Sequence, residues 1–406
     1  MRRTLFVLPL AIACGSSSSN PDSGVPNDDG GGGGDGGGGS DVSVPLDSGT
    51  TTSDAGLIKG GNPNGSCTSM QLPADAKAVD SSGSTNIVGS GTPDSCTQAA
   101  LQTAITKGGI VTFNCGKSPI TIALSATLTV PYDKSTVIDG AGLVTLDGQN
   151  GVQILNWNSP NYKANDNSLT VQHMAFVNAK TNPKVAIPTV KQPSACSQGF
   201  DDGEGGAIYM RDGNLIVVDC VFTNDHAAPL GPDTGGGAIY INGSKNGVIA
   251  VSCTFTNDQG SNAGAVGALN APIQIYDSLV TNNTATGHDA NNNDPKQCSQ
   301  MNNGQNEIGS GGNGGALYGD GNDFDFTVCG DDIENNAAGT NAFGGGIFFT
   351  SDNMAGTLSI IDTKMTNNTG GHWTNVSTGS VTNAGTAVGT NAKQIIITNS
   401  TVQGVN

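Results

Sequence analysis

Acidic side chains gather in two stretches of the sequence, residues 180–204 and 285–313, and the first contains Asp201, Asp202 and Glu204. Carboxylates in such a group can bind Ca²⁺ or act as general acids and bases. Neither stretch matches a Ca²⁺-loop consensus, and the adjacency of Asp201 and Asp202 does not establish the opposed pair that glycoside hydrolysis needs. We keep three readings open: a Ca²⁺ site at Asp201, Asp202 and Glu204, catalysis by Asp201 and Asp202, or a solvated acidic loop. Ca²⁺ is the only cofactor that the sequence suggests.

His226 follows Asn224 and Asp225, at a position that the repeat described below places on a turn. Imidazole can gain or lose a proton near neutral pH, so His226 is a candidate for proton transfer. Its alternative role is to decorate a turn.

Aromatic residues recur at equivalent positions of a Gly-Gly-Ala motif: Tyr209, Tyr240, Tyr318 and Phe348. Each of these residues follows a core-type Ile or Leu, so strand alternation predicts rings that point outward. Exposed rings stack against the C–H faces of sugars. The column therefore predicts a glycan-binding surface, with rings that stack among themselves under a loop as the alternative.

The elements that must position these side chains form a repeat. An apolar residue stands two positions before a recurrent Asn, and alternate apolar residues stand seven and nine positions before it. That spacing predicts strands with one face toward a core. Asn and Gly both tolerate positive φ, so their column predicts a left-handed turn. The column consists of Asn178, Asn224, Asn257, Asn282, Asn335, Asn367 and Gly404.

The Gly-Gly-Ala motif gives the period of this repeat. From Ile208 to Ile239 is 31 residues, and from Ile239 to Leu269 is 30 residues. Short strands and tight turns at a fixed period are typical of a solenoid, in which each coil buries its apolar face against the next. A helix over residues 96–105, with an N-cap at Asp94–Ser95 and a Gly stop after it, is expected to cover the open end of the core.

The Gly205-Gly206-Ala207-Ile208 string and its later copies, with Phe-Thr-Asn at 222–224, resemble the repeats of polymorphic outer-membrane proteins and of the pectin-lyase-like superfamily. Residues 136–142, Thr-Val-Ile-Asp-Gly-Ala-Gly, are similar to the early coils of pectin-lyase-like enzymes, and the likeness covers roughly residues 65–406. The resemblance implies an all-β fold, a right-handed parallel β-helix solenoid with an N-terminal capping helix. The family motif is usually Phe-x-x-Asn whereas this chain has Phe-x-Asn, so the fold carries over and the function does not.

Polysaccharide lyases of that fold often remove a proton beside a uronate carboxylate with Arg or Lys as base, while Ca²⁺ neutralises the acid. The resemblance therefore makes Arg211, the only Arg after the first three residues, a candidate base. An ion pair between Arg211 and Asp212 is the alternative.

The N-terminus carries targeting signals. Arg2 and Arg3 precede an apolar run, so residues 1–13 are expected to be a signal peptide. Cys14 follows Ala11-Ile12-Ala13 and resembles the acylated Cys of a bacterial lipobox, although the usual Leu three residues before it is displaced to Leu10. Residues 14–64, rich in Gly, Ser and Asp, are expected to be a flexible tether, and residues 65–406 the β-helix domain.

Nine Cys are present, and eight remain after Cys14, an even number for an exported protein. Cys96 and Cys115 bracket the predicted helix and the following strand and are expected to form a disulfide. Cys196 and Cys298 share a Cys-Ser-Gln string and would pair if their loops are neighbours. The pairing of four others is not assigned: Cys67, Cys220, Cys253 and Cys329. Cys220 and Cys253 occupy equivalent repeat positions and are candidates for stacked buried thiols.

The net charge of -18 argues against a nucleic-acid partner and against direct binding to anionic membranes. We expect a bacterial cell-envelope protein, either an outer-membrane lipoprotein facing the surface or a secreted one, that meets the membrane only through its lipid anchor. The expected partner is a polysaccharide or glycan, bound or cleaved, with pectate-lyase-like β-elimination as the reaction if the protein is an enzyme. The alternative is an adhesin or structural protein without catalysis.

Overall fold

The computed structural model describes residues 57–183, 203–231, 234–288, 311–351, 353–370 and 388–402. All of these residues belong to one unit of the chain, Asp54–Asn406. The predicted signal peptide, the predicted lipidation site Cys14 and the loop residues Asp201, Asp202, Cys196 and Cys298 lie outside the described residues. In the part of the chain that is described, no helix is long and apolar enough to cross a lipid bilayer.

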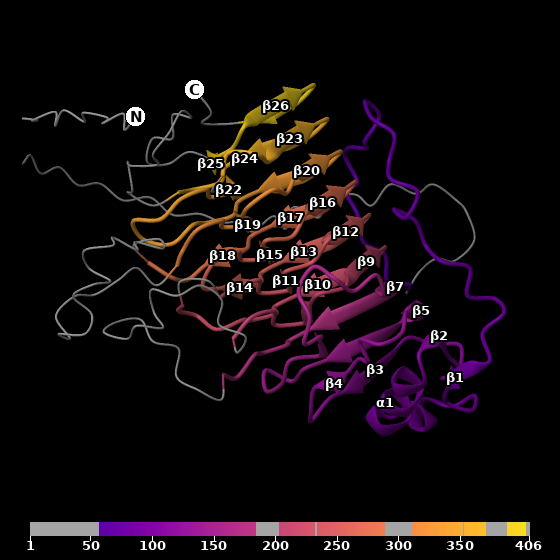
Figure 1. The fold of residues 1–406 in the computed structure, drawn as a ribbon. Coiled ribbons are helices and arrows are strands. Elements are labelled where there is room, and N and C mark those ends of the chain that lie inside the picture. The colour runs from indigo at the N-terminus through magenta and orange to yellow at the C-terminus, as the bar shows by residue number, and fades with distance from the viewer. Residues whose placement is uncertain are drawn as a thin grey trace, which may run out of the picture. The chain divides into compact units, whose positions relative to one another are not determined.

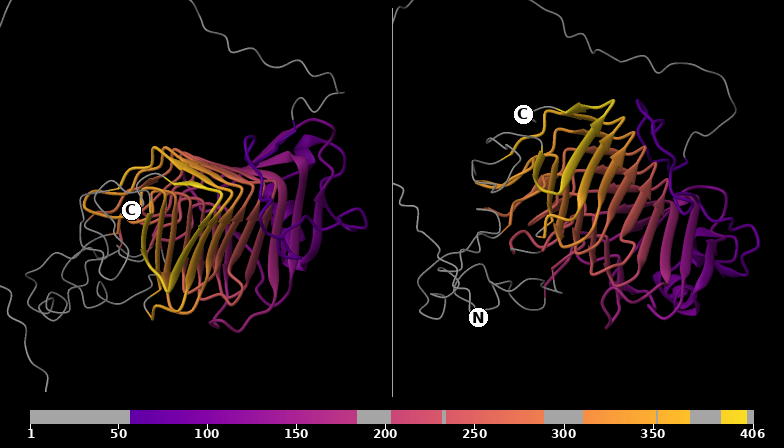
Figure 2. Two further views of the ribbon diagram at one scale, coloured as in Figure 1. Left: turned by 90° about the horizontal axis from the view of Figure 1, so that it is seen from above. Right: turned by 45° about the horizontal axis from the view of Figure 1, so that its top comes forward.

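The described residues form an all-β structure whose paired strands all run parallel. Each strand lies beside its equivalent from the next repeat, so that the strands form long rows (Figures 1 and 2). Sheet A, the largest sheet within the described ranges, has 17 strands: β1 (Asn86–Val88), β2 (Gly109–Phe113), β3 (Ile120–Ala123), β5 (Thr136–Asp147), β7 (Ser168–Val177), β9 (Asn214–Val218), β10 (Val221–Thr223), β12 (Val248–Val251), β13 (Thr254–Thr256), β16 (Ile273–Tyr276), β17 (Leu279–Thr281), β20 (Phe326–Cys329), β21 (Asp332–Glu334), β23 (Thr357–Ile361), β24 (Lys364–Thr366), β26 (Gln394–Thr398) and β27 (Thr401–Val402).

Sheet B is a single row, and a short pair completes the strands of the described residues. Its eight strands are β4 (Leu128–Thr129), β6 (Leu155–Asn158), β8 (Ile208–Arg211), β11 (Ile239–Asn242), β15 (Val266–Leu269), β19 (Leu317–Gly321), β22 (Ile347–Ser351) and β25 (Val388–Asn391). The short pair consists of β14 (Gln259–Gly260) and β18 (Thr284–Ala285).

The predicted apolar columns are confirmed as the core. Phe176, Phe222 and Phe255 lie in register on β7, β10 and β13, are fully buried, and stack with centroid distances of 4.8 and 4.9 Å. The column continues through Val280, Ile333 and Met365, which are also fully buried. Equivalent apolar residues of neighbouring strands therefore form one continuous core.

The predicted left-handed column is also confirmed, and a second one accompanies it. The residues of the predicted column that are described have φ between 52° and 60°: Asn178, Asn224, Asn257, Asn282, Asn335 and Asn367. The other column lies five residues earlier in each coil, between the two strand rows of sheet A, and the sequence analysis missed it. We call it the first corner, and its members with φ between 47° and 76° are His173, Asp219, Ser252, Asp277, Gly330, Asp362 and Asn399.

The Gly-Gly-Ala motif is explained by close backbone stacking beside sheet B. Its first Gly, for example Gly236 with φ 66°, takes a conformation that L side chains rarely adopt. Its second Gly has no room for a side chain: a Cβ on Gly237 would lie 2.2 Å from the carbonyl oxygen of Gly264 in the next coil.

Helix α1 (Gln98–Lys107) packs at the end of the stack where the first strands lie (Figure 1). Its residues Leu101, Ala104 and Ile105 are buried in the core. The predicted N-cap was wrong, because residues 93–95 form a short 3-10 helix and the Thr97 side chain accepts the Ala100 amide proton. The predicted Gly stop is confirmed at Gly108, with φ 73°.

Residues 57–81 cross the first corner and the outer face of sheet A, and we call this segment the clasp. On its way out it donates main-chain hydrogen bonds to the side chains of Asp219, Asp277 and Asp362, which are alternate members of the first corner. On its way back Val79 pairs with the amide side chain of Gln172. The described contacts thus begin at Leu57, within the segment that was predicted to be a tether.

Apolar side chains fasten the clasp to sheet A. Met70, Leu72 and Ala76 pack against Val251 and Tyr276, which point outward from β12 and β16. A Cβ on Gly60 of the clasp would lie 2.4 Å from the Cys220 carbonyl oxygen, so the two backbones approach closely.

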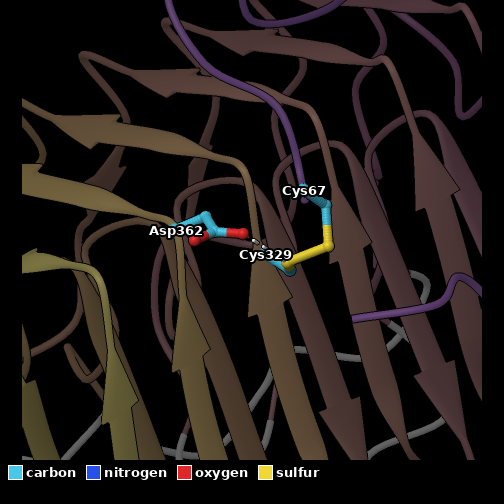
Figure 3. A group of neighbouring side chains, drawn as sticks. All are labelled: Cys67, Cys329 and Asp362. Carbon is cyan, nitrogen blue, oxygen red and sulfur yellow. Dashed lines mark hydrogen bonds between the residues drawn. A yellow bond between two sulfur atoms is a disulfide. The ribbon is translucent and has the colours of Figure 1, made fainter. Parts of the chain in front are cut away.

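The cysteines divide as follows among the described residues. The predicted Cys96–Cys115 disulfide is confirmed. Cys67 of the clasp forms a disulfide with Cys329 at the end of β20, and the sequence analysis had assigned neither (Figure 3). Cys220 and Cys253 are buried free thiols at successive repeat positions, as anticipated.

Candidate functional site

The predicted acidic site is described only in part. Asp201 and Asp202 lie outside the described residues, and Glu204 is buried with 2% of its surface exposed. Glu204 is therefore not part of a solvated acidic surface. Two of the three proposed Ca²⁺ ligands lie outside the described residues, so the Ca²⁺ site stays a prediction.

The main chains of Arg211 and His226 lie at opposite ends of β8. The His226 main chain packs against Gly206, before the start of β8, because a Cβ on Gly206 would lie 2.7 Å from the His226 nitrogen. Arg211 is the last residue of β8. A strand rises about 3.3 Å per residue, so about 10 Å of strand separates the two backbones. The main chains of these two candidate catalytic residues therefore lie apart.

Asp212, the predicted ion-pair partner of Arg211, holds a neighbouring loop. Its carboxylate accepts the Ala164 amide at 2.6 Å, the Asn165 amide at 3.0 Å and the Ser159 hydroxyl at 2.9 Å. Asp212 is fully buried. Its role is therefore to fix residues 159–165 beside the end of β8.

The expectation that the tyrosine column is exposed was wrong. Tyr209, Tyr240 and Tyr318 have 2%, 0% and 0% of their surface exposed. Tyr240 pairs in register with Gly267, where a Cβ would lie 2.7 Å from its ring, so the missing side chain leaves room for a ring to lie down on the sheet. Tyr318 stacks on Phe348 with a centroid distance of 5.4 Å. The three tyrosine rings are therefore buried, which favours the alternative of rings that pack among themselves.

An open groove of about 690 Å³ lies on the outer face of sheet A. Its floor is a row of outward-facing residues in register on three neighbouring strands: Ile249 on β12, Gln274 on β16 and Thr327 on β20. The clasp supplies Pro73 and Asp75 to its lining. The remaining lining residues are Ala355, which precedes β23, and six residues from the turns that lead into these three strands: Lys245, Asn246, Pro272, Asp323, Phe324 and Asp325.

The groove is mildly acidic and rich in polar groups. It contains three carboxylates, those of Asp75, Asp323 and Asp325, and one ammonium group, that of Lys245. The Lys245 nitrogen lies 3.2 Å from Asp166, outside the groove lining, so part of its charge is already compensated. The lining also includes the apolar residues Ile249, Phe324, Pro73 and Pro272.

A second pocket, of about 460 Å³, lies where the clasp begins. It is lined by Leu57, Ile58, Lys59, Asp139, Ala141, Gly142, His173 and Asp219. The His173 Nδ1 lies 3.0 Å from Asp139 Oδ1, and 32% of the His173 side chain is exposed. A carboxylate that holds one imidazole nitrogen orients the other for hydrogen bonding or proton transfer.

Asp139 is held as an anion. Burial raises the pKa of its carboxyl, but hydrogen bonds from Ser81, the Ala141 amide, Gln172 and His173 outweigh burial and bring the pKa below its usual value. The Ser81 hydroxyl is 2.6 Å from Asp139 Oδ2, so Asp139 lies between Ser81 and His173. In a Ser-His-Asp relay the histidine occupies the middle, so Ser81 is not placed as a nucleophile.

One group of three potential metal ligands occurs among the described residues: Cys67, Cys329 and Asp362 (Figure 3). The two sulfur atoms are joined in a disulfide, which removes the thiolates that a metal would need. Asp362 instead accepts hydrogen bonds from the clasp.

The sequence analysis predicted neither the groove nor the second pocket. It also missed the first corner, although the sequence contains a signal for it. Asp, Ser, Gly, Asn or His occurs five residues before every Asn of the predicted column, and these residue types are common at turns. The residues of the groove, by contrast, come from segments as distant as Asp75 and Ala355.

Neither a scan of protein-family models nor a search of curated proteins finds a match to this chain.

Proposed function

We propose that residues 57–402 form a right-handed parallel β-helix that binds a neutral polysaccharide in the groove on sheet A. Parallel pairing of equivalent strands, stacked aromatic and aliphatic columns, and left-handed Asn corners in each coil support the proposed fold. The in-register row of Ile249, Gln274 and Thr327, bordered by the clasp, is the observation that carries the proposed function.

The shape of the groove favours a long ligand. Its floor crosses three parallel strands, and neighbouring strands lie about 4.8 Å apart. A chain molecule laid along this row meets one residue of each coil in turn. A lining with both polar and apolar residues also suits a sugar chain, because sugars have hydroxyl edges and apolar C–H faces.

The charge of the groove favours a neutral ligand over a polyuronate. Three carboxylates against one partly compensated ammonium group would repel a polyanion unless a cation bridged the two. Ca²⁺ could form such a bridge through carboxylate oxygens, and it enters the proposal only for acidic glycans.

A binding role is favoured over polysaccharide lysis. Neither Arg211 nor His226 lines the groove, so the candidate base of a lyase does not meet the proposed ligand. A lyase remains the catalytic version of the proposal, and an adhesin or structural spacer without glycan binding is the alternative.

The binding test uses the full mature chain and a panel of neutral and acidic polysaccharides, with and without Ca²⁺. Isothermal titration should show binding of at least one neutral glycan, and Asp75→Ala with Gln274→Ala should weaken it about tenfold through lost hydrogen bonds. Thr256→Ala, on β13 outside the groove, serves as the matched control and should bind normally. No binding to any glycan, or equal weakening by the control, would refute the proposal and favour the spacer. Unsaturated products from a polyuronate would instead support the lyase.

We also propose that the chain is exported, cleaved before Cys14, lipidated there and displayed on a bacterial outer membrane. The apolar segment before Cys14 and the Gly-rich stretch after it support this proposal. Mass spectrometry of the N-terminal peptide should show an acylated Cys14, and Cys14→Ser should release the protein into the medium. An unmodified peptide that begins elsewhere would contradict it.

A further inference from the structure

A ladder of buried amide side chains lies one residue after the left-handed Asn column. Asn283, Asn336 and Asn368 each follow a left-handed Asn, and at most 6% of their surface is exposed. The oxygen of each accepts a main-chain amide proton from the preceding coil: Asn283 N to Asn336 Oδ1 is 2.9 Å, and Asn336 N to Asn368 Oδ1 is 3.0 Å. The nitrogen of each donates to a main-chain carbonyl of the preceding coil, for example Asn336 Nδ2 to Val280 O at 2.9 Å. Every rung therefore needs one acceptor and one donor.

Asp225 and Asp258 occupy two rungs of the same ladder. Asp225 Oδ1 accepts the Ala179 amide at 2.8 Å, and Asp258 Oδ1 accepts the Asp225 amide at 2.9 Å. The ladder then continues, because the Asp258 amide donates to Asn283 Oδ1 at 2.9 Å. Both aspartates are fully buried, and the Oδ2 of each accepts no hydrogen bond. Oδ2 takes the place of the donating nitrogen of Asn, and an ionised carboxylate has no proton to donate.

Among the described residues, the charged groups that interact with these two carboxyls are themselves carboxylates. Asp147 and Asp258 face Asp225, and Asp225 faces Asp258, so the neighbouring charges are of the same sign. Burial lowers the pKa of the neighbouring His226, and the nearby Lys180 lowers it further, which disfavours the charged form of the imidazole. Burial raises the pKa of Asp225 to about 8, and burial together with Asp225 raises that of Asp258 well above its usual value.

A second ladder, one residue after the first corner, contains the same substitution. Its hydroxyl members accept an amide proton from the preceding coil and donate to a carbonyl two residues earlier: Cys253 N to Ser278 Oγ is 3.0 Å, and Ser278 Oγ to Tyr276 O is 2.7 Å. Asp331 accepts the Ser278 amide at 2.7 Å in this row, is 1% exposed, and its Oδ2 accepts no hydrogen bond. Asp277, Tyr276 and the buried Cys253 thiol are the titratable groups that interact with it, and none of them is a cation.

We propose that Asp225, Asp258 and Asp331 are neutral carboxylic acids in the folded protein, each donating its proton to a main-chain carbonyl as the neighbouring Asn and Ser rungs do. The stack of coils then holds three protons that the unfolded chain releases at neutral pH. These three carboxyls link neighbouring coils through pH-sensitive hydrogen bonds, independently of any ligand in the groove.

The sign of the pH dependence follows from linkage. Aspartate in an unfolded chain titrates near pH 3.9, whereas these carboxyls titrate higher in the folded protein. Their stabilising contribution is complete below about pH 4 and is lost as the pH rises through the folded pKa, which for Asp225 is about 8. The folded protein should therefore be more stable at pH 5 than at pH 9.

The test compares the full mature chain with a variant carrying Asp225→Asn, Asp258→Asn and Asp331→Asn. The melting temperature of the parent protein should fall by several degrees between pH 5 and pH 9, and that of the variant should change much less and be the higher of the two at pH 9. Asp133→Asn, an exposed position, is the matched control and should keep the parental slope. Equal slopes in the parent and the triple variant would overturn the proposal.

Infrared spectroscopy gives a second readout that does not need the variant to fold. The carbonyl stretch of protonated carboxylic acid should be present in the folded parent protein at pH 7 and should vanish on unfolding at the same pH. Its absence from the folded protein would equally overturn the proposal.

Discussion

The clasp and the segment around α1 both cover apolar surface that the stacked strands expose, but they are built in opposite ways. The α1 segment is local, and its disulfide joins Cys96 to Cys115 across 19 residues. The clasp is long-range, and its disulfide joins Cys67 to Cys329 across 262 residues. The α1 segment covers an end of the core, whereas the clasp covers the outer face of sheet A and borders the groove.

This difference shows two ways of covering the apolar surface that a repeat of strands exposes. A helix with its own cap can form from neighbouring residues and then pack Leu101 and Ile105 on the core. The clasp has almost no secondary structure of its own, and its amides bind a row of Asp side chains that exists only once the coils have stacked. The clasp should therefore depend on the stack more than the α1 segment does.

Removal of the two disulfides should separate the segments most strongly. On the chain-entropy model, Cys67→Ser with Cys329→Ser should lower the free energy of unfolding by about 5 kcal/mol, and Cys96→Ser with Cys115→Ser by about 3 kcal/mol, because the longer loop restricts the unfolded chain more. Urea denaturation of the oxidised proteins measures both. A larger loss for the shorter loop would reverse the comparison.

Truncation of the helix contact should come next. Leu101→Ala removes a fully buried side chain and should cost about 3 kcal/mol, because it leaves a cavity at the end of the core. Thr103→Ala, on the exposed face of the same helix, should change the stability by less than about 0.5 kcal/mol. Similar losses for both variants would show that α1 does not seal the core.

Loss of a clasp anchor should have a smaller effect. Asp362→Ala removes the acceptor for the Thr68 and Ser69 amides and should cost about 1 kcal/mol. Hydrogen exchange at these two amides should quicken at neutral pH, while α1 stays protected. If α1 loses protection as well, the two segments are not independent.

The same anchor gives the clasp an acid limit. Hydrogen bonds from Ser69 and from the Thr68 amide lower the pKa of Asp362 to about 2. A depressed pKa contributes stability above the unfolded value near 3.9, and that contribution is lost as the pH falls toward 2. In the parent protein, exchange at Thr68 and Ser69 should therefore quicken relative to α1 between pH 4 and pH 2, beyond the intrinsic pH effect. No such difference would rule out Asp362 as the anchor.

Removal of the helix cap should have the smallest effect. Thr97→Ala deletes the side-chain oxygen that accepts the Ala100 amide and should cost about 0.5 kcal/mol, whereas Thr97→Ser should be nearly neutral. Thermal denaturation followed by circular dichroism measures both changes. Equal destabilisation by Ser and Ala would mean that the methyl group of Thr97, and not its oxygen, matters.

The sequence alone determined the repeat. The Asn column, the aromatic and aliphatic column before it, the helix near residue 100 and the Cys96–Cys115 disulfide were all predictable, because each depends on residues that are close in sequence or recur at a fixed spacing. Alternation also predicted which residues of each strand face the core. It predicted the Tyr240 column wrongly, because alternation tells which side of a strand a residue faces but not what covers that side.

Only the tertiary structure decided what lies on the outside of the coils. The clasp, its Cys67–Cys329 bond, the groove with Asp75 beside Asp325, and the His173–Asp139 pair join segments far apart in the chain, and no local pattern encodes such distances. The buried aspartates of the ladders also could not be predicted from local sequence patterns. Asp225 follows its corner Asn in a place where later coils carry Asn, but only stacking buries that carboxyl and removes the water that would ionise it.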